Sequence, residues 1–271
     1  MLTPAAKLRR LLGQWQRSEE LASAGWLQVE GAEAVRWLLR SDCEIHGLWA
    51  KESTLTSLRP EIEALEPTRI FSGSRQWLCD LLGFPFDRGV VALARRPETI
   101  GSAELLQQLA SEPAWGLVIA DHIHDPANLG TMIRSARCLG ARAMIFSPGC
   151  ADPWSRRALR AGVGHPLLLS LALSQDVVAD LHTIITLGGA TIAAHRGPCA
   201  QPICRSDSFP KRWALVLGNE DRGIQPNVLA ACSHQRYIPL REDCDSLNVA
   251  AAAAILLAHC RDGAQPLQSP P

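Results

Sequence analysis

The first residues able to do chemistry lie in a stretch typical of a helix start, Asp125 to Arg134. Asp125 and Pro126 open that helix as a capping side chain followed by proline at the first helical position. The free N–H groups of a helix start attract anions. Asn128 and Arg134 are six residues apart, about 600° of rotation, so they lie on different faces of an ideal helix. If the two residues share a functional role, the surrounding loops must bring them together. The alternative is that Asn128 is a capping residue and Arg134 a surface cation.

The second group of candidate residues follows an apolar strand and consists of Gly218, Asn219 and Glu220, with Gly223 shortly after. Gly218 lets a ligand or another backbone approach closely, and Gly223 permits a turn with positive φ. Glu220 stands where the strand ends, which is the usual place for a site residue in an open α/β sheet. The alternative for this stretch is an ordinary polar loop between a strand and a helix.

The third group follows Ile238-Pro239 and a polar loop, and it contains Ser246 and Asn248 just before an alanine-rich segment. Either Ser246 or Asn248 is a good N-cap for the helix that follows, and capping alone would explain them. The unbroken alanine run at 250–254 leaves a small helix surface. Another backbone can therefore come very close, either inside the fold or across a dimer interface.

Regular alternation of strands and helices from residue 115 onward positions these groups. It predicts a mostly parallel sheet covered on both faces, with ligands at the carboxyl ends of the strands. Strands are expected at 116–120, 143–146, 166–171, 190–194, 213–217 and 236–238, and helices at 127–139, 153–161, 175–187, 226–231 and 248–260.

The part of the chain before residue 97 shows a shorter α/β pattern. Strands are expected at 26–31, 45–50 and 89–94, with a helix at 32–40. Ser102 caps a predicted short linker helix that closes before Pro113. We therefore expect a domain at 1–96, a linker at 97–113 and a second domain at 114–271.

Composition narrows the class of protein. The 271 residues carry 27 basic and 27 acidic side chains, so net charge alone does not indicate nucleic acid. Six arginines nevertheless lie between residues 134 and 165 against one acid, Asp152. Such a local surface can neutralise phosphates, although each arginine could equally be a solvated surface residue. They are Arg134, Arg137, Arg142, Arg156, Arg157 and Arg160.

The cysteine pattern, together with the lack of a recognisable signal peptide or membrane span in the sequence, favours a cytoplasmic protein. The nine cysteines are scattered, odd in number and without a C-x-x-C pair, which suits reduced thiols. The first twenty residues do not resemble a signal peptide, and no apolar run approaches the length of a membrane span. His195, Cys199 and Cys204 lie close in sequence, but their spacing matches no usual ligand pair, so we expect no metal. A glycine-rich dinucleotide fingerprint and a P-loop are both missing, which disfavours a nicotinamide oxidoreductase.

Taken in order, the three groups resemble the motifs of the SpoU (TrmH) class of RNA ribose methyltransferases. Asn-x-x-x-x-x-Arg at 128–134, Gly-Asn-Glu-x-x-Gly at 218–223, and Ile-Pro with Ser-Leu-Asn-Val at 238–249 carry the resemblance. Each motif alone is weak, whereas the ordered triple is specific. The part before residue 97 is similar, more loosely, to the ribosomal-protein-like RNA-binding domain found ahead of many members.

The resemblance implies S-adenosylmethionine as cofactor, a deep trefoil knot in the C-terminal part of the sheet, and a homodimer. It implies that Arg134 lies at the reacting hydroxyl, with Asn128, Glu220, Ser246 and Asn248 orienting RNA and cofactor. Two departures stand out: Glu242 replaces a frequent glycine, and Arg160-Ala161-Gly162 lacks a frequent hydroxyl. The implied cofactor-binding residues are Ala194, Leu217, Gly218, Asn219, Ile238, Pro239, Leu247 and Asn248.

The function implied is therefore methylation of an RNA ribose 2′-hydroxyl. Ribosomal RNA is favoured as substrate by the N-terminal part, and transfer RNA is the alternative. A knotted RNA-binding protein without catalytic activity is a further alternative.

Overall fold

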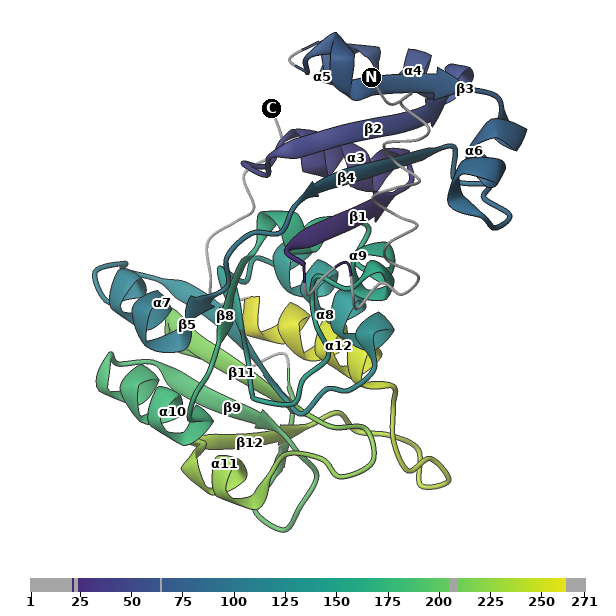
Figure 1. The fold of residues 1–271 in the computed structure, drawn as a ribbon. Coiled ribbons are helices and arrows are strands. Elements are labelled where there is room, and N and C mark those ends of the chain that lie inside the picture. Colours follow the sequence, from purple (N-terminus) through teal and green to yellow (C-terminus); the bar gives the residue numbers. More distant parts are fainter. Residues whose placement is uncertain (1–20, 22–23, 64, 205–208, 262–271) are drawn as a thin grey trace. The chain divides into compact units, whose positions relative to one another are not determined.

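The computed structural model describes residues 21, 24–63, 65–204 and 209–261 (Figure 1; labels as in that figure). The first twenty residues, where no signal peptide is expected, thus lie outside the described part. The chain divides into two compact units. The first contains the described residues up to Glu98 together with Asp152–Leu168, and the second contains Thr99–Ala151 and the described residues from Leu169 onward.

The first unit is built on a four-stranded mixed sheet in the order β1-β4-β2-β3, in which only β2 and β3 are parallel. The expected strands at 26–31, 45–50 and 89–94 and the helix at 32–40 are present, whereas β3 and α4–α6 were not expected. The elements are β1 Trp26–Glu30, α3 Ala32–Leu39, β2 Ile45–Lys51, α4 Glu52–Ser57, α5 Arg59–Ile62, β3 Ile70–Gly73, α6 Arg75–Leu82 and β4 Val90–Arg95, with a 3₁₀ turn at Pro67–Arg69.

Residues 152–168 belong to this first unit although they lie far along the chain. They form α9 (Arg156–Ala161) and a 3₁₀ turn at His165–Leu168, which pack against β1 and α3. The Nε of Arg156 donates a 2.5 Å hydrogen bond to Glu30, which is 5% exposed. A buried carboxylate needs such a partner, so Glu30 helps to hold the segment in place.

The second unit is an eight-stranded sheet in which every pair of neighbours is parallel, in the order β10-β12-β9-β11-β6-β7-β8-β5. Helices α7, α10 and α11 cover one face, and α8 and α12 lie together on the other (Figure 1). The predicted α/β class with a mostly parallel, doubly covered sheet is confirmed. The elements are β5 Ile100–Gly101, α7 Ser102–Leu109, β6 Trp115–Asp121, α8 Pro126–Cys138, β7 Ala143–Phe146, β8 Ser170–Leu173, α10 Val177–Thr186, β9 Ala190–Ala194, β10 Gln201–Pro202, β11 Arg212–Gly218, α11 Pro226–Ala231, β12 His234–Tyr237 and α12 Val249–Arg261.

Three sequence predictions need correction. Ser102 does not cap the helix as expected: Gly101 is at the N-cap position of α7, and the Ser102 hydroxyl donates to Asp180 instead. The helix expected in the linker is present as α7, but it is not a linker, because its Leu105, Leu106 and Leu109 are buried in the core of the second unit. These leucines recur at helical spacing, so they need an apolar surface to cover them. The strand expected at 166–171 is a 3₁₀ turn followed by the shorter β8, because Pro166 has no N–H to donate to a sheet.

Among the described residues, no helix is both long and apolar enough to cross a membrane.

Candidate active site

The start of α8 follows from its first two residues. The Asp125 side chain accepts a 2.9 Å hydrogen bond from the Ala127 N–H, and Pro126 occupies the first helical position, as predicted. This cap fixes where the helix begins. Asn128 therefore lies in the first turn of α8, near the carboxyl end of β6.

A chain of hydrogen bonds joins one residue from each of the three groups. The Asn248 amide donates to Asn128 Oδ1 at 3.0 Å, and the Asn128 amide in turn donates to Glu220 Oε1. Asn248 Oδ1 also accepts from the backbone N–H groups of Ala250 and Ala251, so it caps α12. Each amide thus has its donor and its acceptor engaged, which fixes the orientation of both side chains and of the exposed Glu220 carboxylate. We call Asn248, Asn128 and Glu220 the amide–carboxylate chain.

The loop that carries Glu220 is shaped by its two glycines and by Asn219. A Cβ on Gly218 would lie 2.3 Å from the backbone of Gly223 and Ile224, so the close approach at Gly218 is that of another backbone. Gly223 has a φ of 69°, as a positive-φ turn requires. Asn219 is nearly buried, accepts from the N–H groups of Asp221 and Arg222, and exchanges backbone hydrogen bonds with Gly223.

Arg134 lies further along α8 and does not contact the amide–carboxylate chain. Six residues correspond to about 9 Å along a helix axis, and Arg134 is exposed without a hydrogen bond or ion pair to any described residue. Its charge is therefore available to a ligand. The structure brings together Asn128, Glu220 and Asn248, and leaves Arg134 and the exposed Ser246 outside their hydrogen bonds.

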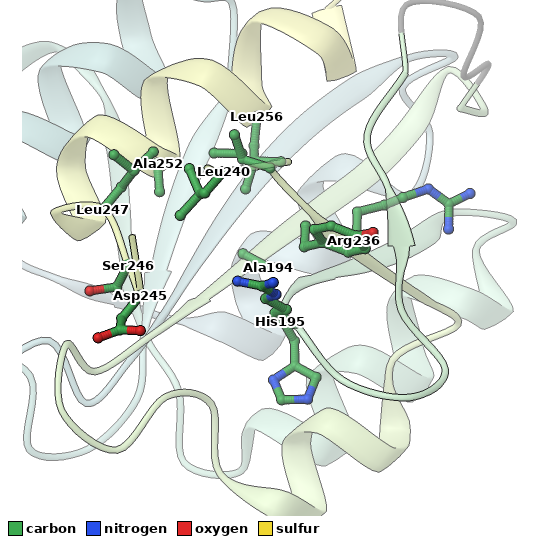
Figure 2. A pocket seen from close by; sticks show the side chains of 12 residues that line it. Ala194, His195, Arg236, Leu240, Asp245, Ser246, Leu247, Ala252 and Leu256 are labelled. Atoms are coloured by element: carbon green, nitrogen blue, oxygen red, sulfur yellow. The ribbon is translucent and has the colours of Figure 1, made fainter. Parts of the chain in front are cut away.

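A pocket lies between the ends of β9 and β12, the loop before α12, and α12 itself (Figure 2). Apolar side chains of Leu240, Leu247 and Ala252 gather on the α12 side, while Asp245 and Ser246 lie along one edge (Figure 2). Such a pocket offers an apolar surface for a flat ring and polar groups for a charged tail. The lining residues are Ala194, His195, Arg196, Arg236, Tyr237, Ile238, Leu240, Asp245, Ser246, Leu247, Ala252 and Leu256.

Of the residues expected to bind the cofactor, Ala194, Ile238 and Leu247 line this pocket. Pro239 and Asn248 are chain neighbours of lining residues, while Leu217, Gly218 and Asn219 lie on β11 and its loop, outside the lining. Ser246, predicted to orient RNA and cofactor, also lines it, whereas sequence reasoning missed the remaining lining residues. Ala252 and Leu256 could have been found, because they are four apart on one face of α12, whereas His195 and Arg236 belong to no motif.

Thiol chemistry at this edge of the sheet is disfavoured. Burial raises the pKa of the Cys150 thiol, and burial together with the nearby Asp121 carboxylate raises the pKa of Cys232 to about 12. Because only the thiolate is a strong nucleophile, these two cysteines stay neutral and unreactive near pH 7.

Comparison with known proteins gives the family of this chain. A family model described as the SpoU rRNA Methylase family matches residues 116–258. The chain belongs to this family. The resemblance stated from the three motifs is thereby confirmed, as is the enzyme class, an RNA methyltransferase.

Individual relatives extend the match over most of the chain. An uncharacterized tRNA/rRNA methyltransferase of Mycobacterium bovis is 31% identical over 229 residues, 84% of this chain and 77% of that protein. The 23S rRNA (guanosine-2'-O-)-methyltransferase RlmB of Acinetobacter baylyi is 30% identical over 207 residues, 74% of this chain and 82% of the relative. The SpoU methyltransferase AviRb of Streptomyces viridochromogenes, solved with AdoMet, shares the fold with a TM-score of 0.76 at 20% identity, over 95% of this chain and 98% of that one.

Proposed function

We propose that this SpoU-family chain methylates a ribose 2′-hydroxyl in ribosomal RNA, with the cofactor in the pocket beside α12. One observation carries the proposal: Ser246 and Leu247 line the pocket, and the next residue, Asn248, begins the amide–carboxylate chain. A bound cofactor would therefore lie directly beside Asn128 and Glu220. Ala194, Ile238 and Leu247 would contact it, and its sulfonium would supply the methyl group.

The reaction is an in-line displacement at the methyl carbon, so the site must align the 2′-oxygen and stabilise its developing negative charge. We assign alignment to Asn128, Glu220, Ser246 and Asn248. The Arg134 guanidinium is exposed and has no hydrogen bond or ion pair to a described residue, which suits binding an RNA phosphate and stabilising the alkoxide. It is not a proton acceptor, because a guanidinium hardly ever loses its proton.

The first unit is our candidate for RNA recognition. Its exposed arginines Arg88, Arg157 and Arg160 offer positive charge to phosphates. Ribosomal RNA is the favoured substrate because the relative RlmB of Acinetobacter baylyi is named for 23S rRNA. Transfer RNA is the second candidate because the Mycobacterium bovis relative is named for both kinds of RNA. We also place the enzyme in the cytoplasm.

We also propose that the chain contains a trefoil knot and forms a homodimer. The knot is supported by the strand order, in which β12 pairs with β9 while α12 returns to pack on α8. The dimer is supported by the small exposed surface of α12, where Ile255 is 38% exposed among alanines. Ile255→Glu should shift sedimentation from dimer to monomer. Ile185→Glu, at a site 40% exposed on α10, is the matched control and should stay dimeric.

Calorimetry and activity test the proposal together. S-adenosylmethionine should bind the purified chain without added metal, and purified ribosomal RNA should accept methyl groups in preference to transfer RNA. Binding of RNA without any methylation would instead favour a knotted RNA-binding protein.

A further inference from the structure

Charged side chains of opposite sign line different sides of the pocket beside α12. Arg196 follows β9 and Arg236 belongs to β12, whereas Asp245 comes from the loop before α12. In Figure 2, Asp245 lies near Ser246 and Leu247, across the pocket from Arg236. Among the described residues that line the pocket, Asp245 is the only acidic one. Its carboxylate is therefore the one negative charge that the lining offers to a ligand.

The Asp245 carboxylate is not neutralised by the loop that carries it. Arg241 is the only basic residue between Ile238 and Asn248. Its Nε and Nη2 donate to the two carboxylate oxygens of Asp243 at 3.0 and 3.2 Å, a two-pronged geometry that fixes the guanidinium. Asp245 itself is exposed and makes no hydrogen bond or ion pair with a described residue. The charge of Arg241 is thus held by Asp243, and that of Asp245 is left for a ligand.

The position of Asp245 follows from its distance along the chain to Asn248. Asn248 is held by its 3.0 Å hydrogen bond to Asn128 and by capping α12, and three residues of chain span at most about 10 Å. The methyl group must reach a 2′-oxygen aligned by the amide–carboxylate chain. The sulfonium that carries this methyl group must therefore lie at the end of the pocket formed by Ser246 and Leu247, where Asp245 also lines it.

We propose that Asp245 makes the pocket discriminate between S-adenosylmethionine and its demethylated product, S-adenosylhomocysteine. The inference rests on the proposed function. The two molecules share their adenosine, amine and carboxylate groups, and they differ in the methyl group and in the positive charge on sulfur. A nearby carboxylate attracts the sulfonium and not the neutral thioether. Asp245 thus favours binding of the methyl donor and release of the product.

The other carboxylate near the reacting groups is that of Glu220, which does not belong to the pocket lining. It accepts a hydrogen bond from the Asn128 amide. Its assigned role is alignment, so the discrimination between the two molecules is assigned to Asp245 alone.

The test is calorimetry of the full chain with each of the two molecules, without RNA. Asp245→Asn keeps the size of the side chain and removes its charge. An attraction between solvent-exposed charges typically changes affinity by about two- to fivefold. We expect the ratio of the Kd for S-adenosylhomocysteine to the Kd for S-adenosylmethionine to fall by that factor, mainly through weaker binding of S-adenosylmethionine. In the wild type this ratio should also fall as salt is added, because salt screens exposed charges, whereas in Asp245→Asn it should stay constant.

Glu242→Gln is the matched control, because Glu242 is an exposed acid of the same loop that does not line the pocket. It should keep the wild-type ratio and its salt dependence. The inference is overturned if Asp245→Asn keeps the wild-type ratio, if it weakens binding of both molecules equally, or if Glu242→Gln lowers the ratio as much. Failure of the proposed function would look different, because a wild-type chain that binds both molecules would then methylate no ribose.

Discussion

Asn248 links the last helix to the proposed reaction centre, so its removal should affect stability and cofactor binding separately. In Asn248→Ala, the acceptor for the N–H groups of Ala250 and Ala251 is lost, and so is the 3.0 Å hydrogen bond to Asn128. Asn128 and Glu220 would remain paired but would no longer be anchored to α12. We expect reduced affinity for S-adenosylmethionine, because the adjacent Ser246 and Leu247 line the pocket.

The magnitude follows from the two lost interactions. Losing an N-cap typically costs about 1 kcal/mol, and a hydrogen bond between exposed side chains contributes roughly 0.5–1 kcal/mol. The expected loss in free energy of unfolding is therefore about 1–2 kcal/mol, and each kcal/mol lowers Tm by about 2–4 °C in a chain of this size.

Thermal unfolding and calorimetry of two cap variants separate the effects. Asp176 caps α10 by accepting from the N–H groups of Val178 and Ala179, outside the pocket. Asp176→Ala should lose a similar amount of stability while binding S-adenosylmethionine as the wild type does. If Asn248→Ala and Asp176→Ala bound the cofactor equally well, or if Asn248→Ala unfolded at the wild-type temperature, our reading of Asn248 would be wrong.

Three further predictions concern single residues. Arg134→Ala should change stability by less than about 0.5 kcal/mol but slow methylation by roughly 100-fold or more, whereas Arg142→Ala, the control measured in the same assay, should stay active. Gly218→Ala should destabilise the fold by about 1–3 kcal/mol because its Cβ would meet the Gly223 backbone. Gly101→Ala, with open space around it, should leave stability unchanged. Equal midpoints of urea unfolding for these two variants would contradict the prediction. Burial raises the pKa of the Asp180 carboxyl above its ordinary value, so the folded state binds this proton more tightly than the unfolded state does. The free energy of unfolding should therefore fall as pH rises through the raised pKa. In Asp180→Asn, urea unfolding should show a weaker fall of this free energy with pH.

Local signals in the sequence located most elements of the second unit. Strands β7 and β9 and helix α11 have the bounds predicted, because each is an apolar run or an amphipathic segment bounded by turn residues. The two-residue strands β5 and β10 gave no such signal. The position of 152–168 depends on the pairing of Arg156 with Glu30, which are 126 residues apart, and no local pattern predicts such a contact.

In the candidate site, too, local features could be predicted from the sequence, whereas contacts between distant residues could not. Capping by Asp125 and the turn at Gly223 follow from residue type, and both were predicted. The joining of Asn248, Asn128 and Glu220 was not, because hydrogen bonds spanning 120 and 92 residues depend on the whole sheet. Only the resemblance to the SpoU class put these residues in one site.

The most direct test of the central claim is analysis of the methylated product. Purified chain would be incubated with ribosomal RNA and S-adenosylmethionine labelled in its methyl group, and the RNA digested to nucleosides for mass spectrometry. We predict label in one kind of 2′-O-methylnucleoside, and we expect the Arg134→Ala enzyme to incorporate it roughly 100-fold more slowly. Label on a base, or no label from wild-type enzyme that binds the cofactor, would contradict the assignment of a ribose 2′-hydroxyl as the acceptor.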